Sequence, residues 1–192
     1  MSYHAMTNST FPPADGIYEA EDETTSQISL LLCHGWSPDT ISSWLEDEME
    51  SDPAPLIEKV SAEYARLVPE ASEDAKRIDA LHEALAKRNI SFSFDEGYDK
   101  GEAVEDGGER AEKAGHRGYT YCTQQDVDRV IHTGDLLFGF GDYENPSLET
   151  DAEVAALVVE ALKEVGFSPV WDGNANRRIA CSGVVFELPL AD

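Results

Sequence analysis

The stretch GYTYCTQQDVDRVIHTGDLLFGFG, residues 118–141, concentrates more reactive and polar side chains than any other part of the chain. Cys122 and His132 are the residue types of a thiol nucleophile and its general base. Cys122 precedes an expected helix whose dipole can lower a thiol pKa, but His132 closes that helix, roughly 15 Å away at about 1.5 Å per residue. They therefore cannot share a hydrogen bond, and a buried core thiol is the commoner role for such a cysteine. Three other histidines stay open as partners: His34, His82 and His116.

The start of that helix offers a structural and a functional interpretation. Thr123 and Asp126 stand at capping-box spacing, and the charge of Asp126 also suits a helix N-terminus. Gln124 and Gln125 have no such structural role. Polar residues at a strand-to-helix turn can line a pocket at the edge of an open α/β sheet, although solvated turn residues are commoner. The candidate ligand-binding residues here are Tyr119, Tyr121, Gln124, Gln125 and Asp126.

A second cluster follows in WDGNANRR, residues 171–178. Asp-Gly is a turn dipeptide, and Trp171 suits packing against a helix. Arg178, with its neighbour Arg177, can pair with one of the many acids or capture an anionic ligand group. The ion pair is the commoner role, and Trp171 and Arg178 join the candidate ligand-binding residues as the functional alternative.

The sequence predicts neither a metal site nor a cofactor site. The acidic segment 95–112 does not match the ligand spacing of a calcium loop, so we expect an exposed flexible connection whose second half can be helical. Phosphate-binding, dinucleotide-binding and hydrolase motifs are absent, and we expect no cofactor. Three widely spaced cysteines, without a C-x-x-C pair, favour reduced thiols.

Periodicity predicts the elements that position these residues. Apolar residues recur at helical spacing in three segments, the first opened by Ser37 as N-cap, followed by 53–67 and 73–88, which ends at Asn89. Alternation or apolar runs predict strands at 90–94, 118–122, 135–141, 168–172 and 178–187, with helices at 123–132 and 150–165. Thr150 and Glu153 have capping-box spacing. The fold class is α+β: N-terminal helices packed on a mixed sheet with βαβ-type crossovers and a terminal hairpin.

The expected organisation has three parts. Residues 1–25 are polar and acidic and predict a disordered leader. Residues 26–89 form a helical N-terminal region, and residues 90–192 form an α/β sheet domain that makes one compact unit with the helices.

Charge and hydropathy limit the partners. The 192-residue chain carries 39 acidic and 14 basic residues, a formal net charge of −25, so its surface repels nucleic acids and anionic lipids. A basic protein, a cation or a salt-rich habitat would suit this charge. The sequence has neither a secretory signal nor an apolar run long enough to cross a membrane, and we expect a cytoplasmic location.

The C-terminal two thirds resemble a known family. The order of RIDALHEAL, RGYTYCTQQDVDRVI, DLLFGFG and VVEALKEVGFSPVWDGNANRRI, over roughly residues 74–182, is similar to an uncharacterised bacterial family of unknown function. Relatives carry a cysteine-rich segment that could bind a metal after the first strand, where this chain has SFSFDEGYDKGEAVED; a thiolate metal site is therefore not expected. The resemblance implies no activity. Matching residues are Gly118, Tyr119, Gln125, Asp126, Gly139, Trp171, Asp172, Gly173, Arg178 and Ile179.

Two functional hypotheses follow. The first is a non-enzymatic binding or interaction module, with an immunity-like or inhibitor-like role against a basic partner as one form of it. The alternative is a small enzyme or small-ligand-binding protein with a polar site at the turn of residues 119–126.

Overall fold

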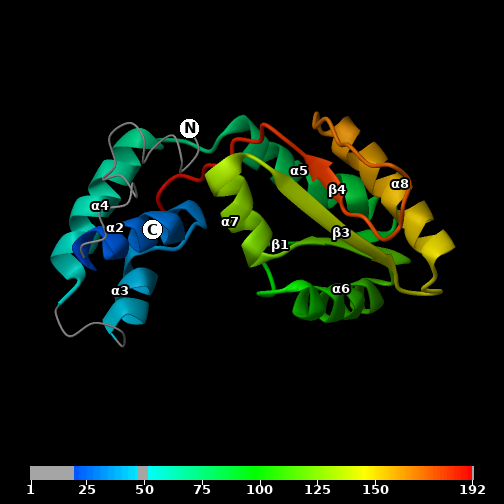
Figure 1. Ribbon diagram of the computed structural model, residues 1–192, viewed down its shortest axis with the longest axis horizontal. Coiled ribbons are helices and arrows are strands. Elements are labelled where there is room, and N and C mark those ends of the chain that lie inside the picture. The colour runs from blue at the N-terminus through cyan, green and yellow to red at the C-terminus, as the bar shows by residue number, and fades with distance from the viewer. Residues whose placement is uncertain (1–19, 47–51, 192) are drawn as a thin grey trace. The chain divides into compact units, whose positions relative to one another are not determined.

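The computed structural model describes residues 20–46 and 52–191, so most of the predicted leader lies outside the described residues (Figure 1). The described end of that leader is helical, because α2 (Ala20–Cys33) begins at Ala20. The chain forms two compact units. The first runs to Ala75 and also contains Ile131–Thr133 and the segment from Val185; the second contains Lys76–Val130 and Gly134–Val184.

The first unit is built from helices. α3 (Pro38–Glu46) begins after Ser37, whose hydroxyl accepts the amide of Thr40 at 3.2 Å, which confirms the predicted N-cap. α4 (Ala54–Leu67) buries the apolar face that its spacing predicts, including Ile57 and Val60. These helices supply the core of this unit because their apolar stripes face one another.

The segment from Val185 is bound to this unit through its backbone. The Tyr64 hydroxyl donates to the carbonyl of Leu188 at 2.6 Å, and the Ser72 hydroxyl donates to that of Val185 at 2.6 Å. The prediction of a strand over 178–187 is therefore wrong beyond its first residues. Gly183 has φ +73°, a left-handed conformation that ends the extended chain.

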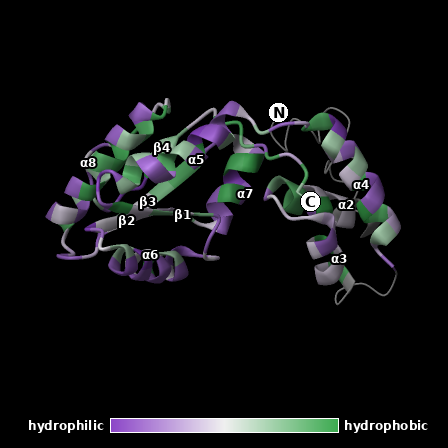
Figure 2. Cartoon of the chain, turned by 180° about the vertical axis from the view of Figure 1, so that it is seen from behind, coloured by the Kyte–Doolittle hydropathy of each residue, from purple (hydrophilic) through white to green (hydrophobic). Residues whose placement is uncertain are grey.

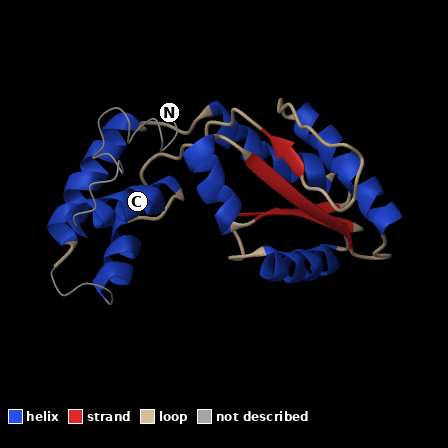
Figure 3. Cartoon of the chain, viewed as in Figure 1, coloured by secondary structure: helices blue, strands red, loops and turns tan. Residues whose placement is uncertain are grey.

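A four-stranded mixed sheet forms the centre of the second unit (Figure 3). Its order is β1 (Ile90–Phe94), β2 (Gly118–Cys122), β3 (Leu136–Asp142) and β4 (Ile179–Cys181). β1 and β2 are parallel and joined by a βαβ crossover, whereas β3 is antiparallel to both β2 and β4. The predicted α+β class and mixed sheet are confirmed, and the terminal hairpin is reduced to one bridge between Val170 and Ala180.

Helices cover both faces of this sheet (Figure 1). On one face, α8 (Leu148–Glu164) packs against β3, and His82 of α5 (Glu73–Ala86) contacts Phe92 of β1, with ring centroids 4.7 Å apart. α6 (Lys100–Ala114) covers the other face over β1 and β2. Apolar and polar residues alternate along these helices, as this half-buried position requires (Figure 2).

α6 corrects the expectation of a flexible acidic connection. It is a regular helix because Asp99 caps it, accepting the amides of Gly101 and Glu102, and because Gly115 closes it at φ +67°. Its inward face is made of small residues, Ala103, Gly107 and Ala111. Such residues leave no large apolar stripe to identify a helix, so the charged outer face dominated the sequence pattern.

The helix caps agree with prediction in one case and differ in another. α7 (Gln124–Thr133) begins with the predicted capping box of Thr123 and Asp126. α8 begins with a box of Ser147 and Thr150, three residues before the predicted pair, so the Thr150–Glu153 prediction is wrong. Across the described ranges, no helix combines the length and apolar character needed to cross a membrane.

Two adjacent glycines of α6 test how this helix packs on the sheet. A Cβ at Gly107 would lie 2.7 Å from Tyr119 Cδ2, whereas one at Gly108 would lie 3.6 Å from Tyr143 Cδ2. We predict that Gly108→Ala raises the free energy of unfolding by about 0.5–1 kcal/mol, because alanine is the better helix former. Gly107→Ala should lower it by about 1–3 kcal/mol through overpacking. Urea denaturation measures both, and equal effects of the two substitutions would refute the described contact of α6 with β2.

Candidate functional site

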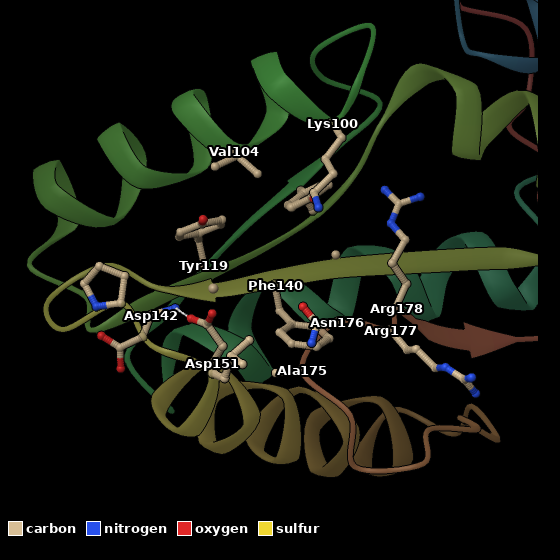
Figure 4. A pocket seen from close by; sticks show the side chains of 15 residues that line it. Lys100, Val104, Tyr119, Phe140, Asp142, Asp151, Ala175, Asn176, Arg177 and Arg178 are labelled. Carbon is tan, nitrogen blue, oxygen red and sulfur yellow. Dashed lines mark hydrogen bonds between the residues drawn. The ribbon is translucent and has the colours of Figure 1, made fainter.

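A cavity of about 310 Å³ opens beside β3 in the second unit (Figure 4). Its walls come from α6, β2, β3, the start of α8 and the turn before β4. The lining residues are Lys100, Val104, Tyr119, Tyr121, Gly139, Phe140, Gly141, Asp142, Pro146, Leu148, Asp151, Ala175, Asn176, Arg177 and Arg178. Three of the predicted site residues, Tyr119, Tyr121 and Arg178, therefore meet in one cavity.

Two tyrosines form the part of the wall that lies over β3. Tyr119 and Tyr121 point to the α6 face of β2 and stack with ring centroids 6.3 Å apart. Opposite them, β3 carries Gly141 and Gly139, in register with Tyr119 and Tyr121 respectively. A Cβ at Gly139 would lie 2.1 Å from Tyr121 Cζ, and one at Gly141 would lie 2.5 Å from the Tyr119 hydroxyl oxygen. The rings thus lie across the neighbouring strand because that strand has no side chains there.

Burial weakens the acidity of both phenols. The pKa of Tyr119 rises to about 12 through burial and the nearby Tyr121 and Asp151. The pKa of Tyr121 also rises through burial, although the Arg178 guanidinium acts in the opposite direction. Both hydroxyls are therefore neutral at physiological pH and can donate or accept hydrogen bonds.

Arg178 is held in place by a buried carboxylate. Its Nη1 and Nη2 donate to the two oxygens of Asp126, both at 2.7 Å, and the guanidinium carbon lies 5.4 Å from the Tyr121 ring centroid. Asp126 is only 2% exposed and also accepts the backbone amide and hydroxyl of Thr123. Its oxygens are therefore fully engaged, so Asp126 orients Arg178 instead of facing the cavity.

Arg178 retains hydrogen-bonding capacity. Its Nε is buried and has no hydrogen-bond partner within the described residues, whereas the side chain as a whole is 30% exposed. Because the bidentate pair uses one proton on each terminal nitrogen, further protons remain for another group.

Lys100 adds a second cation from the first residue of α6. It is exposed at the cavity and forms no ion pair within the part of the chain that the structure describes. Figure 4 shows its side chain extending from α6 towards β3, on the same side of that strand as the Arg178 guanidinium. An anionic group entering here would meet the Lys100 ammonium and the guanidinium protons that Arg178 keeps beyond its pair with Asp126.

Carboxylates mark another part of the cavity. Asp142 pairs with Arg117 at 2.7 Å and accepts the amide of Asn145 at 2.8 Å; these bonds prevail over burial and lower its pKa. Asp151 uses Oδ1 to accept the amide of Asp142 at 2.8 Å. Arg117, which also pairs with Glu153, and the Asn145 amide engage Asp142, so Asp151 is the carboxylate with an oxygen left to offer a ligand.

Trp171 supports the cavity from outside. Its indole nitrogen donates to the carbonyls of Asn174 and Arg177, both at 3.1 Å, and closes the turn between them. Its ring meets Phe140 edge-on, with centroids 5.9 Å apart. Trp171 therefore stabilises the turn that leads to Arg178. It also packs against Phe140, which lines the cavity.

The other singled-out residues lie elsewhere. Gln124 and Gln125 occupy the first two positions of α7, where both are exposed and neither lines the cavity. Cys122 is fully buried at the end of β2, and burial raises the pKa of its thiol well above the ordinary value. His132 stands in the last turn of α7, as the sequence predicts. No group of three or more potential metal ligands gathers within the described ranges.

The sequence reasoning missed Lys100, Phe140 and Asp151. One signal in the sequence could have located the cavity wall. Two glycines stand at alternate positions of β3, opposite two tyrosines at alternate positions of β2. This pattern indicates that the tyrosine rings lie across a strand without side chains. Lys100 and Asp151 carried no such signal, because each is one charged residue among many.

Neighbouring arginines test the buried ion pair. Arg178→Gln should lower the free energy of unfolding by about 3 kcal/mol, because it leaves the Asp126 charge buried without its partner. Arg177, whose side chain is 71% exposed, pairs with Asp172 at the surface, and Arg177→Gln should cost less than about 1 kcal/mol. Urea denaturation gives both values; an Arg178→Gln cost no greater than that of Arg177→Gln would contradict the structural role of the pair.

The thiols provide a chemical test of the buried core. Cys33, Cys122 and Cys181 are free and buried, and burial raises the pKa of Cys33 and Cys122. We predict that Ellman's reagent at pH 8 leaves all three unmodified in the native protein and modifies three after unfolding. Rapid modification of Cys122 in the native state would revive it as a candidate nucleophile.

The comparisons with known proteins give one match. A family model described as "Domain of unknown function (DUF6891)" matches residues 16–186. This agrees with the resemblance to an uncharacterised family and extends it through the N-terminal helices. No curated protein and no solved structure matches the chain.

Proposed function

The chain belongs to this family of unknown function, and we propose that it is a ligand-binding protein whose cavity beside β3 takes a small organic molecule with an anionic group. The observation that carries the proposal is Lys100, a cation without an ion pair among the described residues, at the same cavity as the guanidinium protons that Arg178 keeps beyond its pair with Asp126. Lys100 and Arg178 are two of only 14 basic residues, in a chain with 39 acidic ones. Cationic side chains in a concave, tyrosine-lined site are typical of recognition of carboxylate or phosphate groups.

The side chains favour binding over catalysis. The lining residues include no histidine and no cysteine, and the raised pKa values of Tyr119 and Tyr121 make them poor general bases at neutral pH. Asp142 is engaged with Arg117 and the Asn145 amide. We therefore propose a binding site without acid–base chemistry.

Interaction with a basic protein is the second candidate. Its support is the net charge of −25 and the exposed acidic face of α6. Part of that charge is already balanced, because Glu109 pairs with Lys113 and Glu96 pairs with Arg110. The cavity therefore supports the ligand-binding proposal, and the acidic surface supports interaction with a basic protein.

The net charge and the free thiols support two further proposals, on nucleic acid as a partner and on the cellular location. The acidic surface disfavours nucleic acid as a partner, since it repels the phosphate backbone. Three free cysteines suit a reducing compartment, and we propose a cytoplasmic location.

Anionic probes test the binding proposal. We predict that N-acetylalanine, succinate or inorganic phosphate, at millimolar concentration and low ionic strength, raises the melting temperature of the full chain by mass action. Lys100→Gln should weaken binding of the successful probe about tenfold by calorimetry, the effect of removing one charge-assisted hydrogen bond.

Lys113→Gln is the matched control. It removes the same charge from the same helix, 13 residues and so roughly 20 Å away at about 1.5 Å per residue. The affinity of the Lys113→Gln variant for the probe should equal that of the unaltered chain. Failure of every anionic probe, or equal loss in both variants, would overturn the proposed site.

A further inference from the structure

The cavity beside β3 has two ends, each marked by a tyrosine. The Tyr119 ring lies across Gly141 of β3. The Tyr121 ring lies across Gly139, two residues earlier in the same strand. The ring centroids are 6.3 Å apart, and this distance gives the approximate separation of the two ends.

The end at Tyr121 carries positive charge. The Arg178 guanidinium carbon lies 5.4 Å from the Tyr121 ring centroid. Because α6 returns the chain from the end of β1 to the start of β2, it runs opposite to β2. Gly107 of α6 faces Tyr119, and Lys100 precedes it by seven residues, about 10 Å at about 1.5 Å per residue. Lys100 therefore lies in the direction of Tyr121.

The end at Tyr119 carries negative charge. Asp151 accepts the amide of Asp142, the residue after Gly141, at 2.8 Å through Oδ1. Its charge contributes to the raised pKa of Tyr119, which agrees with a carboxylate close to that phenol. Figure 4 shows Asp142 and Asp151 towards one end of β3, and Lys100 and Arg178 towards the other. The cavity thus presents opposite charges to the two ends of a guest.

This polarity limits the guests that can use both ends. An α-amino acid holds its ammonium nitrogen and carboxyl carbon only about 2.5 Å apart, less than the separation of the ends. An unbranched chain with three methylenes between the same groups extends them to about 5 Å at ordinary bond lengths and angles. The tyrosine rings and Val104 offer apolar contact to such methylenes, and the cavity volume of about 310 Å³ accommodates a molecule of this size.

We propose that the ligand of this cavity is a zwitterion of the ω-amino acid class, with a carboxylate and a primary ammonium at opposite ends of a short aliphatic chain; this rests on the proposed anion-binding function. The carboxylate binds at Lys100 and Arg178, and the ammonium binds at Asp151. The methylenes lie against the tyrosine rings between them. A simple anion fills one end only, so the ammonium adds a charge-assisted hydrogen bond to the affinity.

Calorimetry with two matched pairs of probes tests the inference on the full chain at low ionic strength. γ-Aminobutyrate should bind about tenfold more tightly than butyrate, the effect of one charge-assisted hydrogen bond. Glycine should gain much less over acetate, because its charges are too close together to reach both ends.

Asp151→Asn removes the charge and keeps the Oδ1 acceptor of the Asp142 amide. It should abolish the preference for γ-aminobutyrate and leave butyrate affinity at least as high as in the unaltered chain, which also shows that the variant folds. Glu149→Gln is the matched control, since it removes one charge from the first turn of the same helix outside the cavity lining. It should leave the preference for γ-aminobutyrate unchanged.

The outcomes separate this inference from the proposed anion site. Equal affinities of γ-aminobutyrate and butyrate for the unaltered chain, or a preference that survives Asp151→Asn, would overturn the zwitterion and leave the anion site standing. A gain of glycine over acetate equal to that of γ-aminobutyrate over butyrate would overturn the ω-amino acid class. Failure of γ-aminobutyrate and butyrate together with every simple anion would remove both the zwitterion and the anion site.

Discussion

The bidentate pair between Asp126 and Arg178 is the interaction on which the site depends. It joins the start of α7 to the residue before β4, 52 positions apart in the chain, and it aims the guanidinium over the Tyr121 ring. Asp126 serves two purposes at once, because the same carboxylate caps α7 through Thr123. A charge this deeply buried is tolerated only when its hydrogen bonds are complete. The Asp126 carboxylate therefore ties together the start of α7, the start of β4 and the wall of the cavity.

A second constraint shapes the space beside that pair. Tyr119 and Tyr121 can lie across β3 only because Gly141 and Gly139 face them. Large rings on one strand and bare backbone on the next give a smooth wall, and the rings cover glycines that would otherwise weaken the strand. The same arrangement places two neutral hydroxyls over the glycines of β3, where both tyrosines line the cavity.

Local patterns predicted much of this architecture. The Thr123–Asp126 cap, β2, α7 and the distance between Cys122 and His132 all follow from neighbouring residues. The partner of Arg178 did not, since choosing one carboxylate among 39 acidic residues depends on tertiary packing. Likewise α6 was hidden by its small inward residues. The sequence also did not show that β4 would pair with only part of β3, with three residues where β3 has seven.

Amide chemical shifts during a titration with an anionic probe test the central claim, that the cavity beside β3 binds an anionic group at Lys100 and Arg178. In a ¹H–¹⁵N correlation spectrum of the full chain titrated with the anionic probe that raises its melting temperature, the account predicts saturable shifts of the Lys100 and Phe140 amides, with smaller shifts at Gly139 and Gly141. The Lys113 amide, at the far end of α6, should stay in place. Saturable shifts confined to residues outside the cavity, or no shift at Phe140 at saturation, would contradict it.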